Sequence, residues 1–327
     1  MDHIRWFAPN RYCTLPVPPL REAGLRIATA GDAAARIAFA ADGVCAVEAY
    51  RYAWAHRVPL VVYLWDLPPW QVGSGRPNPI VPFRGRLLKV PRPFGAYTER
   101  NGYFSRQRYA ARHAAAVWVP SAGTQQDVKR VFGVDAERVP FCFDSDRFHR
   151  GAGWQEPSGI PTLLAISRLT PQKNHAAILR AAVLLPHKVR LHIVGRGTEA
   201  ALLRRVATKL GLDLTLDEAW QSDQQIVDAY RGASAVVSLS RFEGFGLTPM
   251  EATAMGIPAV VSDIPPHREY ADRGVQLVPL DDDQAAARAI DNVLRGDRGL
   301  DRAYRTTSEL TIEACAERLV QRFRALL

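Results

Sequence analysis

The stretch Ser240-Arg-Phe-Glu-Gly-Phe-Gly-Leu-Thr-Pro-Met-Glu-Ala-Thr-Ala-Met-Gly-Ile-Pro-Ala-Val-Val-Ser-Asp263 decides the fold predicted for this chain. An apolar run, Ala235-Val-Val-Ser-Leu239, precedes it, another, Ile257-Pro-Ala-Val-Val261, closes it, and both predict buried strands. The glycines between the runs predict a turn that opens a helix. Strand, turn, helix and strand make a βαβ unit, with the turn at the carboxyl edge of a parallel sheet, where open α/β sheets bind ligands.

The residues of this turn have the chemistry of a sugar-nucleotide site. Gly244 and Gly246 allow the backbone to turn sharply and to approach a ligand closely. The N–H groups at the start of the following helix attract an anion such as a phosphate. Glu243, just before the turn, and Glu251, in the following helix, can accept hydrogen bonds from the hydroxyls of a sugar and of a ribose.

The segment around both glutamates closely resembles the E-x7-E motif of the retaining glycosyltransferases of family 4, the glycosyl transferases group 1 type, which have the GT-B fold. Three other segments resemble further motifs of that family. They are the linker Val139-Pro-Phe-Cys-Phe-Asp-Ser-Asp-Arg-Phe148, the diphosphate motif Ile166-Ser-Arg-Leu-Thr-Pro-Gln-Lys-Asn174 and the strand and glycine turn Leu191-His-Ile-Val-Gly-Arg-Gly197. The motifs follow the family's order over roughly residues 117 to 290, and the residues before them show little resemblance.

The resemblance implies an α/β fold of the GT-B type, with two Rossmann-like, doubly wound parallel-sheet domains facing a central cleft. The implied parts are a short acceptor-side domain (1–148), a nucleotide-sugar-binding domain (149–310) and a C-terminal helix (311–327) that packs back on the first domain. In the first domain the residue patterns predict strands at 4–7, 25–29, 36–41, 60–64 and 116–119, helices at 43–56 and 106–115, and a proline-rich loop at 11–19. Ser222-Asp-Gln-Gln225 predicts a capping box at the start of a helix.

The resemblance also implies an activity. A hexose-type sugar would pass, with retention of configuration, from a UDP- or GDP-sugar to an acceptor that is a carbohydrate, a lipid-linked sugar or a small molecule. No metal and no separate cofactor are expected. The implied catalytic residues are Arg168, Lys173, Glu243 and Asp66, and the implied donor-binding residues are Arg168, Lys173, Gly195, Arg196, Trp220, Glu243, Gly244, Phe245, Gly246, Leu247, Thr248 and Glu251.

Each of these residues has its own implied role. Arg168 and Lys173 would neutralise the leaving diphosphate, which stabilises the transition state electrostatically. Glu243 would hold the sugar ring, and Glu251 the ribose hydroxyls. Asp66 would contact the sugar or orient the acceptor.

A structural reading of the same residues stays open. Thr248-Pro-Met-Glu251 fits a helix start, with Thr248 as N-cap, Pro249 at N1 and Glu251 closing a capping box. Taken alone, Arg168 and Lys173 fit solvated surface charge, and Gly195 fits an ordinary strand end.

Two positions depart from the family's pattern. Its first loop usually carries a glycine pair, which the corresponding Tyr12-Cys-Thr-Leu-Pro-Val-Pro-Pro19 lacks. Many members have His-Asp after the strand that we expect at 60–64, whereas this chain has Trp65-Asp66. The role of the histidine is therefore unassigned here.

The composition is that of an ordinary globular protein of two domains, with 327 residues, 47% hydrophobic and 23% charged. The four cysteines are scattered without metal-binding or disulfide spacing, which favours a reducing compartment. We find no secretory signal and no apolar stretch long enough for a membrane span, and we expect a cytoplasmic protein.

The net charge is +9, and basic residues concentrate between Pro82 and His113, interleaved with aromatic ones. The basic residues there are Arg84, Arg86, Lys89, Arg92, Arg100, Arg106, Arg108 and Arg112. Three functional interpretations are open: a loop that receives an acceptor, a peripheral contact with the inner face of the membrane, and a nucleic-acid-binding patch. The fourth is structural, a solvated loop whose aromatic side chains point into the protein. We expect no nucleic acid as a partner.

Two other functions remain as alternatives. The first is a sugar-nucleotide epimerase or hydrolase on the same fold, for which Asp66 is the only clear acidic candidate in the N-terminal half. The second is a non-catalytic binding module for nucleotide sugars or nucleic acid. The presence of Arg168, Lys173, Glu243 and Glu251 together argues against an inactive site.

Overall fold

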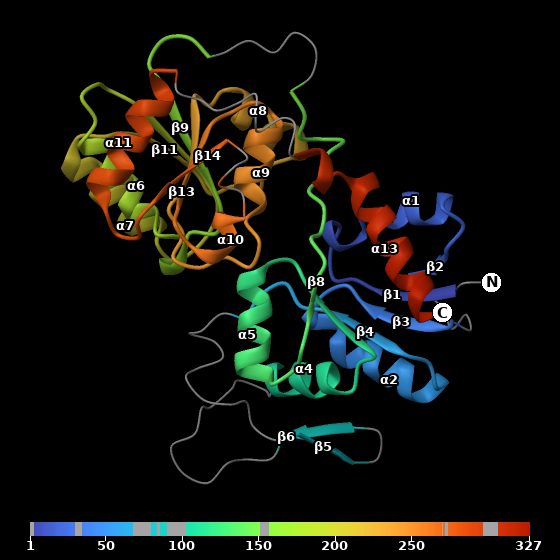
Figure 1. The fold of residues 1–327 in the computed structure, drawn as a ribbon. Helices are drawn as coiled ribbons and strands as arrows, with labels where there is room; N and C mark the ends of the chain where they lie inside the picture. Colours follow the sequence, from blue (N-terminus) through green and yellow to red (C-terminus); the bar gives the residue numbers. More distant parts are fainter. Residues whose placement is uncertain are drawn as a thin grey trace. The chain divides into compact units, whose positions relative to one another are not determined.

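The computed structural model of the chain describes residues 3–29, 35–67, 80–83, 86–89, 103–150, 157–269, 271, 274–296 and 307–327. The chain forms two compact units, shown in Figure 1. The first comprises Met1–Cys142 with Ile312–Leu327, and the second comprises Phe143–Thr311. Each unit contains one six-stranded parallel sheet with flanking helices, so the predicted doubly wound α/β class is confirmed.

The boundary between the units precedes the predicted position at 148/149, and packing explains the difference. The ring of Phe141 lies 5.3 Å from that of Tyr63 in the first unit. The N–H of Phe143 instead donates to the carbonyl of Leu310, and Phe148 packs on Tyr230, which are contacts within the second unit. The linker motif therefore belongs largely to the second unit.

The first unit has the strand order β2-β1-β3-β4-β7-β8. Its elements are β1 (His3–Phe7), η1 (Tyr12–Thr14), α1 (Val17–Glu22), β2 (Arg26–Ala28), β3 (Ile37–Ala40), η2 (Gly43–Cys45), α2 (Ala46–His56), β4 (Leu60–Tyr63), α4 (Tyr103–Arg112), β7 (Ala116–Val119), α5 (Ala122–Phe132), β8 (Glu137–Arg138) and α13 (Ile312–Leu326). A separate antiparallel hairpin, β5 (Ile80–Phe83) with β6 (Arg86–Lys89), was not predicted from the sequence.

The loop predicted at 11–19 is instead a pair of short helices, η1 and α1. Prolines occupy the first turn of α1, where the missing N–H groups would have no intrahelical partner. The prolines in this segment thus start a helix rather than exclude one.

Helix α13 contributes to the core of the first unit. Its buried side chains recur at helical spacing, from Ile312 through Leu319 to Phe323. The ring of Phe323 lies 5.2 Å from those of Phe39 and Trp118. The end of the chain therefore folds with its beginning.

The second unit has the strand order β11-β10-β9-β12-β13-β14. Its elements are β9 (Thr162–Ile166), η4 (Pro171–Lys173), α6 (His175–Val183), β10 (Arg190–Val194), α7 (Ala200–Leu210), β11 (Asp213–Asp217), α8 (Asp223–Arg231), β12 (Ala235–Ser238), α9 (Leu247–Ala254), β13 (Ala259–Ser262), α10 (Pro265–Arg268), β14 (Val275–Val278), α11 (Asp283–Leu294) and η5 (Thr307–Leu310). The predicted capping box of Ser222 and Gln225 opens α8 and is confirmed.

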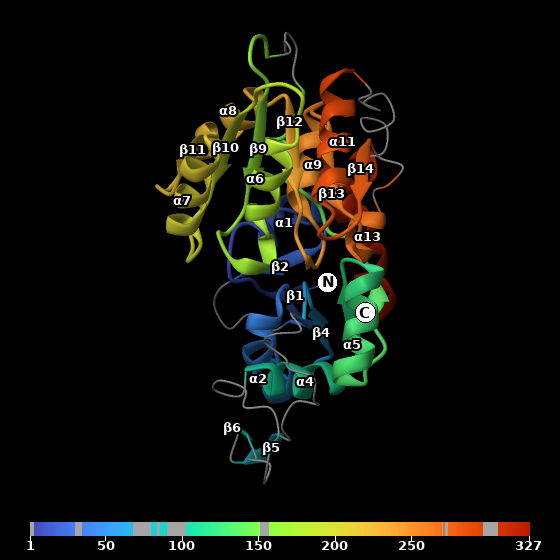
Figure 2. The same ribbon diagram turned by 90° about the vertical axis from the view of Figure 1, so that its left-hand side faces the viewer.

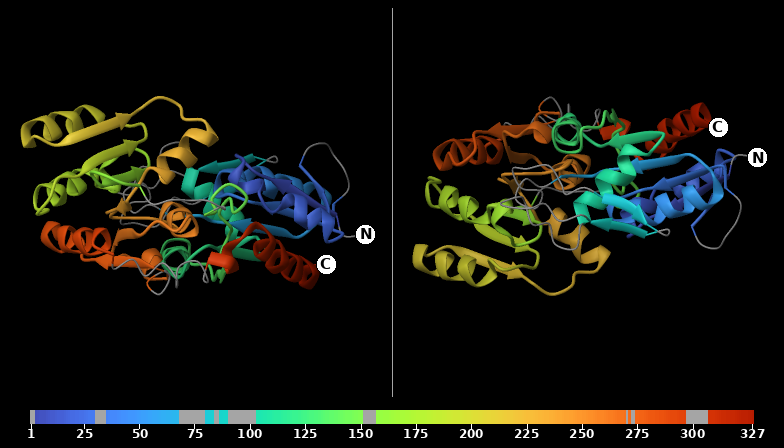
Figure 3. Two further views of the ribbon diagram at one scale, coloured as in Figure 1. Left: turned by 90° about the horizontal axis from the view of Figure 1, so that it is seen from above. Right: turned by 90° about the horizontal axis from the view of Figure 1, so that it is seen from below.

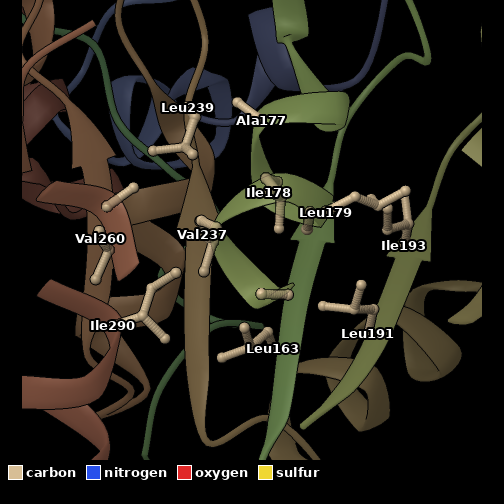
Figure 4. Packing of buried hydrophobic residues seen from close by; sticks show 14 of the residues in the cluster. Leu163, Ala177, Ile178, Leu179, Leu191, Ile193, Val237, Leu239, Val260 and Ile290 are labelled. Atoms are coloured by element: carbon tan, nitrogen blue, oxygen red, sulfur yellow. The ribbon is translucent and has the colours of Figure 1, made fainter. Parts of the chain in front are cut away.

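Helices α6, α7 and α11 cover one face of the second sheet, while α8 and α9 lie on the other (Figures 2 and 3). The covered face is apolar. Leu163, Leu191 and Val237 from three neighbouring strands meet Ile178 of α6 and Ile290 of α11 (Figure 4). This packing fixes the strand ends that carry the predicted site.

Candidate active site

The predicted site lies where the second sheet reverses its order. From β9 the chain continues to β10 and β11 on one side, and then returns to β12, β13 and β14 on the other. Strands β9 and β12 are direct neighbours, paired in parallel, so their carboxyl ends meet at one edge. Ligands of open α/β sheets bind at such a switch point.

Backbone and side-chain hydrogen bonds tie the two loops at this edge together. The side-chain amide of Asn174, a residue with φ of 54°, donates to the carbonyl of Leu239 over 3.1 Å. The N–H of Arg241 donates to the carbonyl of Gln172 over 2.8 Å. The hydroxyl of Thr248 donates to the carbonyl of Ile166, the last residue of β9, over 3.2 Å. The loop after β9 and the start of α9 are thus held in register.

This arrangement brings two predicted catalytic residues into contact. Lys173 Nζ lies 2.6 Å from Glu243 Oε1, and each side chain is 15% exposed. They are 70 positions apart in the sequence. Arg168, from the same loop as Lys173, is exposed and has no ion-pair or hydrogen-bond partner for its guanidinium in the part of the chain that the structure describes.

The N-terminus of α9 adds positive potential to the same edge. Gly246 is its N-cap, with φ of 93°, a left-handed conformation that favours glycine. No side chain caps this helix start. The buried residues Gly244 and Phe245 lead into it, and Leu247 and Thr248 form its first turn. An uncapped helix start with the exposed Arg168 and the partly exposed Lys173 on the adjacent loop favours an anionic ligand.

Glu251 is not the capping residue that its spacing allowed. Because Gly246 is the N-cap of α9, Glu251 lies two residues beyond the position that closes a capping box. The Thr248 hydroxyl instead donates to the carbonyl of Ile166. The carboxylate is 6% exposed, and its Oε2 accepts a 2.7 Å hydrogen bond from the hydroxyl of Tyr230. Burial raises the pKa of Glu251 to about 7, an effect opposed by the Tyr230 hydrogen bond and by Arg147.

Gly195 has a structural explanation. A Cβ at this position would lie 1.8 Å from the carbonyl oxygen of Ser167, because the loops after β9 and β10 approach each other closely. Ser167 and Leu169 donate backbone hydrogen bonds to Val194 and Arg196, which fix this approach. The glycine therefore supports the loop that carries Arg168.

Two further predicted donor-binding residues lie together beyond β10 and β11. The Arg196 guanidinium donates to the carbonyl of Glu218 over 2.7 Å and lies 6.0 Å from the ring centroid of Trp220. Trp220 is 83% exposed, the largest exposed fraction among the large hydrophobic side chains described. A planar pair of this kind can stack on a flat ligand group.

Two buried histidines near the Lys173–Glu243 pair were not predicted. Burial, and to a smaller extent Lys173, lower the pKa of His175 to about 4 against the opposing effect of Glu243. Its Nε2 lies 3.0 Å from the Ser167 hydroxyl. Burial also lowers the pKa of His267, whose Nδ1 lies 2.8 Å from the carbonyl oxygen of Ser262. Both are neutral near pH 7 and brace the loops at this edge.

Asp66 lies in the first unit, exposed, after β4. Its neighbour Trp65 takes the place of the family's usual histidine. The Trp65 indole N–H donates to the carbonyl of Ala41 over 3.0 Å, and its ring packs on Tyr63 and Phe141. Trp65 thus has a packing role.

The basic segment 82–113 lies partly outside the described residues. Arg84, Arg92, Arg100, Phe94 and Tyr97 are not among them, and of residues 80–83 and 86–89 only the backbone is described. Within α4, Arg108 donates to the carbonyl of Phe132 over 3.2 Å.

The described residues also lack two features of other classes of protein. No group of three or more His, Cys, Asp or Glu side chains there could hold a metal ion. None of the helices described has the length and apolar character needed to cross a membrane.

Residues 150–309 match the model of the family Glycosyl transferases group 1, so this part of the chain is a domain of that family, of the GT-B type. Curated relatives include the O-antigen chain mannosyltransferase RfbU of Salmonella typhimurium, 27% identical over 57% of this chain and 53% of the relative. A D-inositol 3-phosphate glycosyltransferase of Xylanimonas cellulosilytica is 26% identical over 73% of this chain and 61% of the relative. A GDP-mannose:cellobiosyl-diphosphopolyprenol alpha-mannosyltransferase of Xanthomonas campestris is 31% identical over 48% of this chain and 40% of the relative. The chain thus matches about half the length of these relatives.

Solved structures match over the full chain. Anabaena HepE, in complex with UDP and glucose, has a TM-score of 0.75 at 14% identity and covers 99% of this chain and 100% of its own. Sucrose-phosphate synthase from Thermosynechococcus elongatus has a TM-score of 0.75 at 16% identity and covers 100% of this chain and 99% of its own. The predicted GT-B fold is therefore confirmed.

The close approach at Gly195 makes a stability prediction. We expect Gly195→Ala to destabilise the chain by more than about 3 kcal/mol, because the backbone of two loops must separate. Gly211→Ala is the matched control, since Gly211 has φ of 64° and no atom within 4 Å of an added Cβ. It should cost only about 1 kcal/mol of left-handed strain. Urea unfolding measures both, and equal losses would contradict the assignment.

The buried Glu251 makes a prediction about pH. Between 4.5, the ordinary pKa of a glutamate, and about 7 the folded chain keeps a proton that the unfolded chain releases, so stability falls as pH rises through this window. The loss attributable to Glu251 is on the order of 3 kcal/mol. We expect Glu251→Gln to gain stability relative to wild type from pH 5 to pH 8 in urea unfolding. Glu137→Gln, at an exposed carboxylate, should show no such trend, and a flat difference for Glu251→Gln would contradict the burial argument.

Proposed function

We propose that this chain is a retaining, metal-independent glycosyltransferase of family 4 that moves a hexose-type sugar from a UDP- or GDP-sugar to an acceptor. The observation that carries the proposal is the meeting of Lys173 and Glu243 at the β9/β12 switch point, beside Arg168 and the uncapped start of α9. This edge offers cations and amides for a diphosphate and a carboxylate for hydroxyls. The family domain at 150–309 and the mannosyltransferases among the relatives support it.

The proposed chemistry needs charge stabilisation at the leaving group. As the bond from the anomeric carbon to the diphosphate breaks, its electron pair passes to the diphosphate oxygen. Arg168, Lys173 and the amides of Leu247 and Thr248 would stabilise this charge without a metal. Glu243 would accept hydrogen bonds from the sugar hydroxyls. The oxygen of an acceptor hydroxyl would bond to the anomeric carbon, and the proton of that hydroxyl would pass to the departing diphosphate oxygen.

The remaining donor contacts follow from the residues at the same sheet edge. Glu251 would accept a hydrogen bond from a ribose hydroxyl, and Trp220 with Arg196 would stack on the base. One relative's name includes GDP-mannose, which favours a guanine nucleotide as the first donor to test.

The acceptor side of the proposal rests on the first unit. Asp66 at the end of β4 would contact the sugar or the acceptor, and the basic segment 82–113 would receive the acceptor or touch the inner face of a membrane. A cytoplasmic location is part of this proposal. The relatives' names favour a carbohydrate or lipid-linked acceptor.

The proposal predicts donor binding without metal. We expect GDP or UDP to raise the melting temperature in the presence of EDTA, by linkage of about 2.7 kcal/mol at 100 Kd. Lys173→Ala and Arg168→Ala should each lower kcat/KM by about 100-fold or more. Lys129→Ala is the control. Lys129, on α5 in the first unit, also pairs with a carboxylate, that of Asp135, over 2.6 Å.

The outcomes separate the competing functions. Loss of the thermal shift in EDTA would overturn the metal-independent reading. Donor hydrolysis or epimerisation with no transfer to any sugar acceptor would favour the other enzyme class. Nucleotide binding without turnover would favour a binding module. Near-normal turnover in both alanine variants would show that the diphosphate binds at another site.

A further inference from the structure

Tyr230 joins helix α8 to the start of α9. The side chain is fully buried, and its hydroxyl donates to Glu251 Oε2 over 2.7 Å. The same hydroxyl lies 3.4 Å from the carbonyl oxygen of Thr248, in the first turn of α9. Among the residues that the structure describes, Tyr230 is the sole hydrogen-bond donor to the Glu251 carboxylate. One oxygen of that carboxylate is therefore held, and the other is left for another partner.

Two contacts from the linker fix α8 at its two ends. Near the start of α8, Arg147 pairs with Asp223 over 2.6 Å and with Asp144 over 3.2 Å. Near the end of α8, the Phe148 ring lies 5.4 Å from the Tyr230 ring, edge to face at 71°. Phe148 is fully buried, so the tyrosine ring has little freedom to turn away from Glu251.

Tyr230 differs from the other groups that affect the ionisation of Glu251, because it is uncharged. From the linker, Arg147 favours the ionised carboxylate and Asp144 opposes it. Strands β12 and β13 and the short helix η5 also pack on α9. Both strands have the uncharged sequence Ala-Val-Val-Ser, and the acidic residue of η5, Glu309, is exposed. The Tyr230 hydroxyl is thus a group that favours ionised Glu251 and can be removed without changing any charge.

We propose that Tyr230 is a positioning residue for the donor: its hydroxyl orients the Glu251 carboxylate so that the second oxygen accepts a hydrogen bond from a hydroxyl of the bound nucleotide. This inference rests on the proposed function, which assigns Glu251 to the ribose. Tyr230 itself does not touch the donor. Phe148, at the end of the linker motif, supports the ring that makes the contact.

Tyr230→Phe is the direct test, because it removes the hydroxyl and keeps the ring against Phe148. We expect the Kd for GDP or UDP at pH 7 to rise by about tenfold or more, as for a lost hydrogen bond to a charged group. Without the hydroxyl the carboxylate holds its proton to higher pH. The pH midpoint below which affinity is lost should therefore move upward by about one pH unit. With the donor saturating, kcat should stay near wild type while the donor KM rises.

Tyr63→Phe is a matched control. Tyr63 is also fully buried, and its hydroxyl donates over 2.7 Å to the carbonyl of Val139 in the first unit. The variant removes an equivalent hydrogen bond and should lower stability by a similar amount. We expect it to leave the nucleotide Kd and its pH midpoint unchanged, so a general loss of stability cannot imitate the result for Tyr230→Phe.

Calorimetric titration of the wild type, Tyr230→Phe, Glu251→Gln and the double variant separates the outcomes. If the positioning role is right, the two single losses in affinity will not add in the double variant. If Glu251→Gln weakens nucleotide binding and Tyr230→Phe does not, the role of Tyr230 is overturned and the proposed function stands. If neither variant changes the affinity, both the ribose assignment of Glu251 and the role of Tyr230 are wrong. If the wild type binds no nucleoside diphosphate, the proposed function fails, and this inference with it.

Discussion

The parallel pairing of β9 with β12 is the constraint on which the candidate site depends. Each strand places its loop at the same edge, and bonds such as Thr248 to Ile166 keep the two loops from sliding. The apolar face under α6 and α11 holds both strands (Figure 4). Lys173 and Glu243 come from loops that are far apart in the chain, so their contact follows from strand order, not from local structure.

Glu251 differs from these contacts, because its burial lowers the stability of the fold. A carboxylate with 6% exposure and one neutral hydrogen-bond donor is a poor structural element, because its charged form is separated from water. The raised pKa of Glu251 reflects that penalty. A buried carboxylate with a shifted pKa at the ligand edge of a sheet is a candidate for a binding or catalytic role. The structure removes the capping alternative, which would have explained Glu251 without a ligand.

Sequence patterns were sufficient for the fold class and for the elements around the site. Apolar runs predicted β12 and β13, and the glycines predicted the turn into α9. The contact of Tyr230 with Glu251 could not be predicted, because the two residues are 21 positions apart on two helices whose packing depends on the whole sheet. The helix α1 was missed because its prolines have the same local signature as a loop. The buried His175 and His267 gave no signal, since a histidine's surroundings decide whether it is charged.

The Lys173–Glu243 pair has a consequence for how a donor would be accepted. Both side chains are largely shielded, so each charge depends on the other in the absence of ligand. Under the proposed function the ammonium group of Lys173 would pair with the diphosphate of the bound donor instead of with Glu243. The Glu243 carboxylate would then need new hydrogen-bond donors, and the hydroxyls of the sugar attached to the same diphosphate can supply them. A free nucleotide brings the phosphates without those hydroxyls and would leave Glu243 uncompensated. Under the proposed function the pair would therefore favour the intact nucleotide sugar over the free nucleotide, and so would discriminate the donor from the nucleotide product.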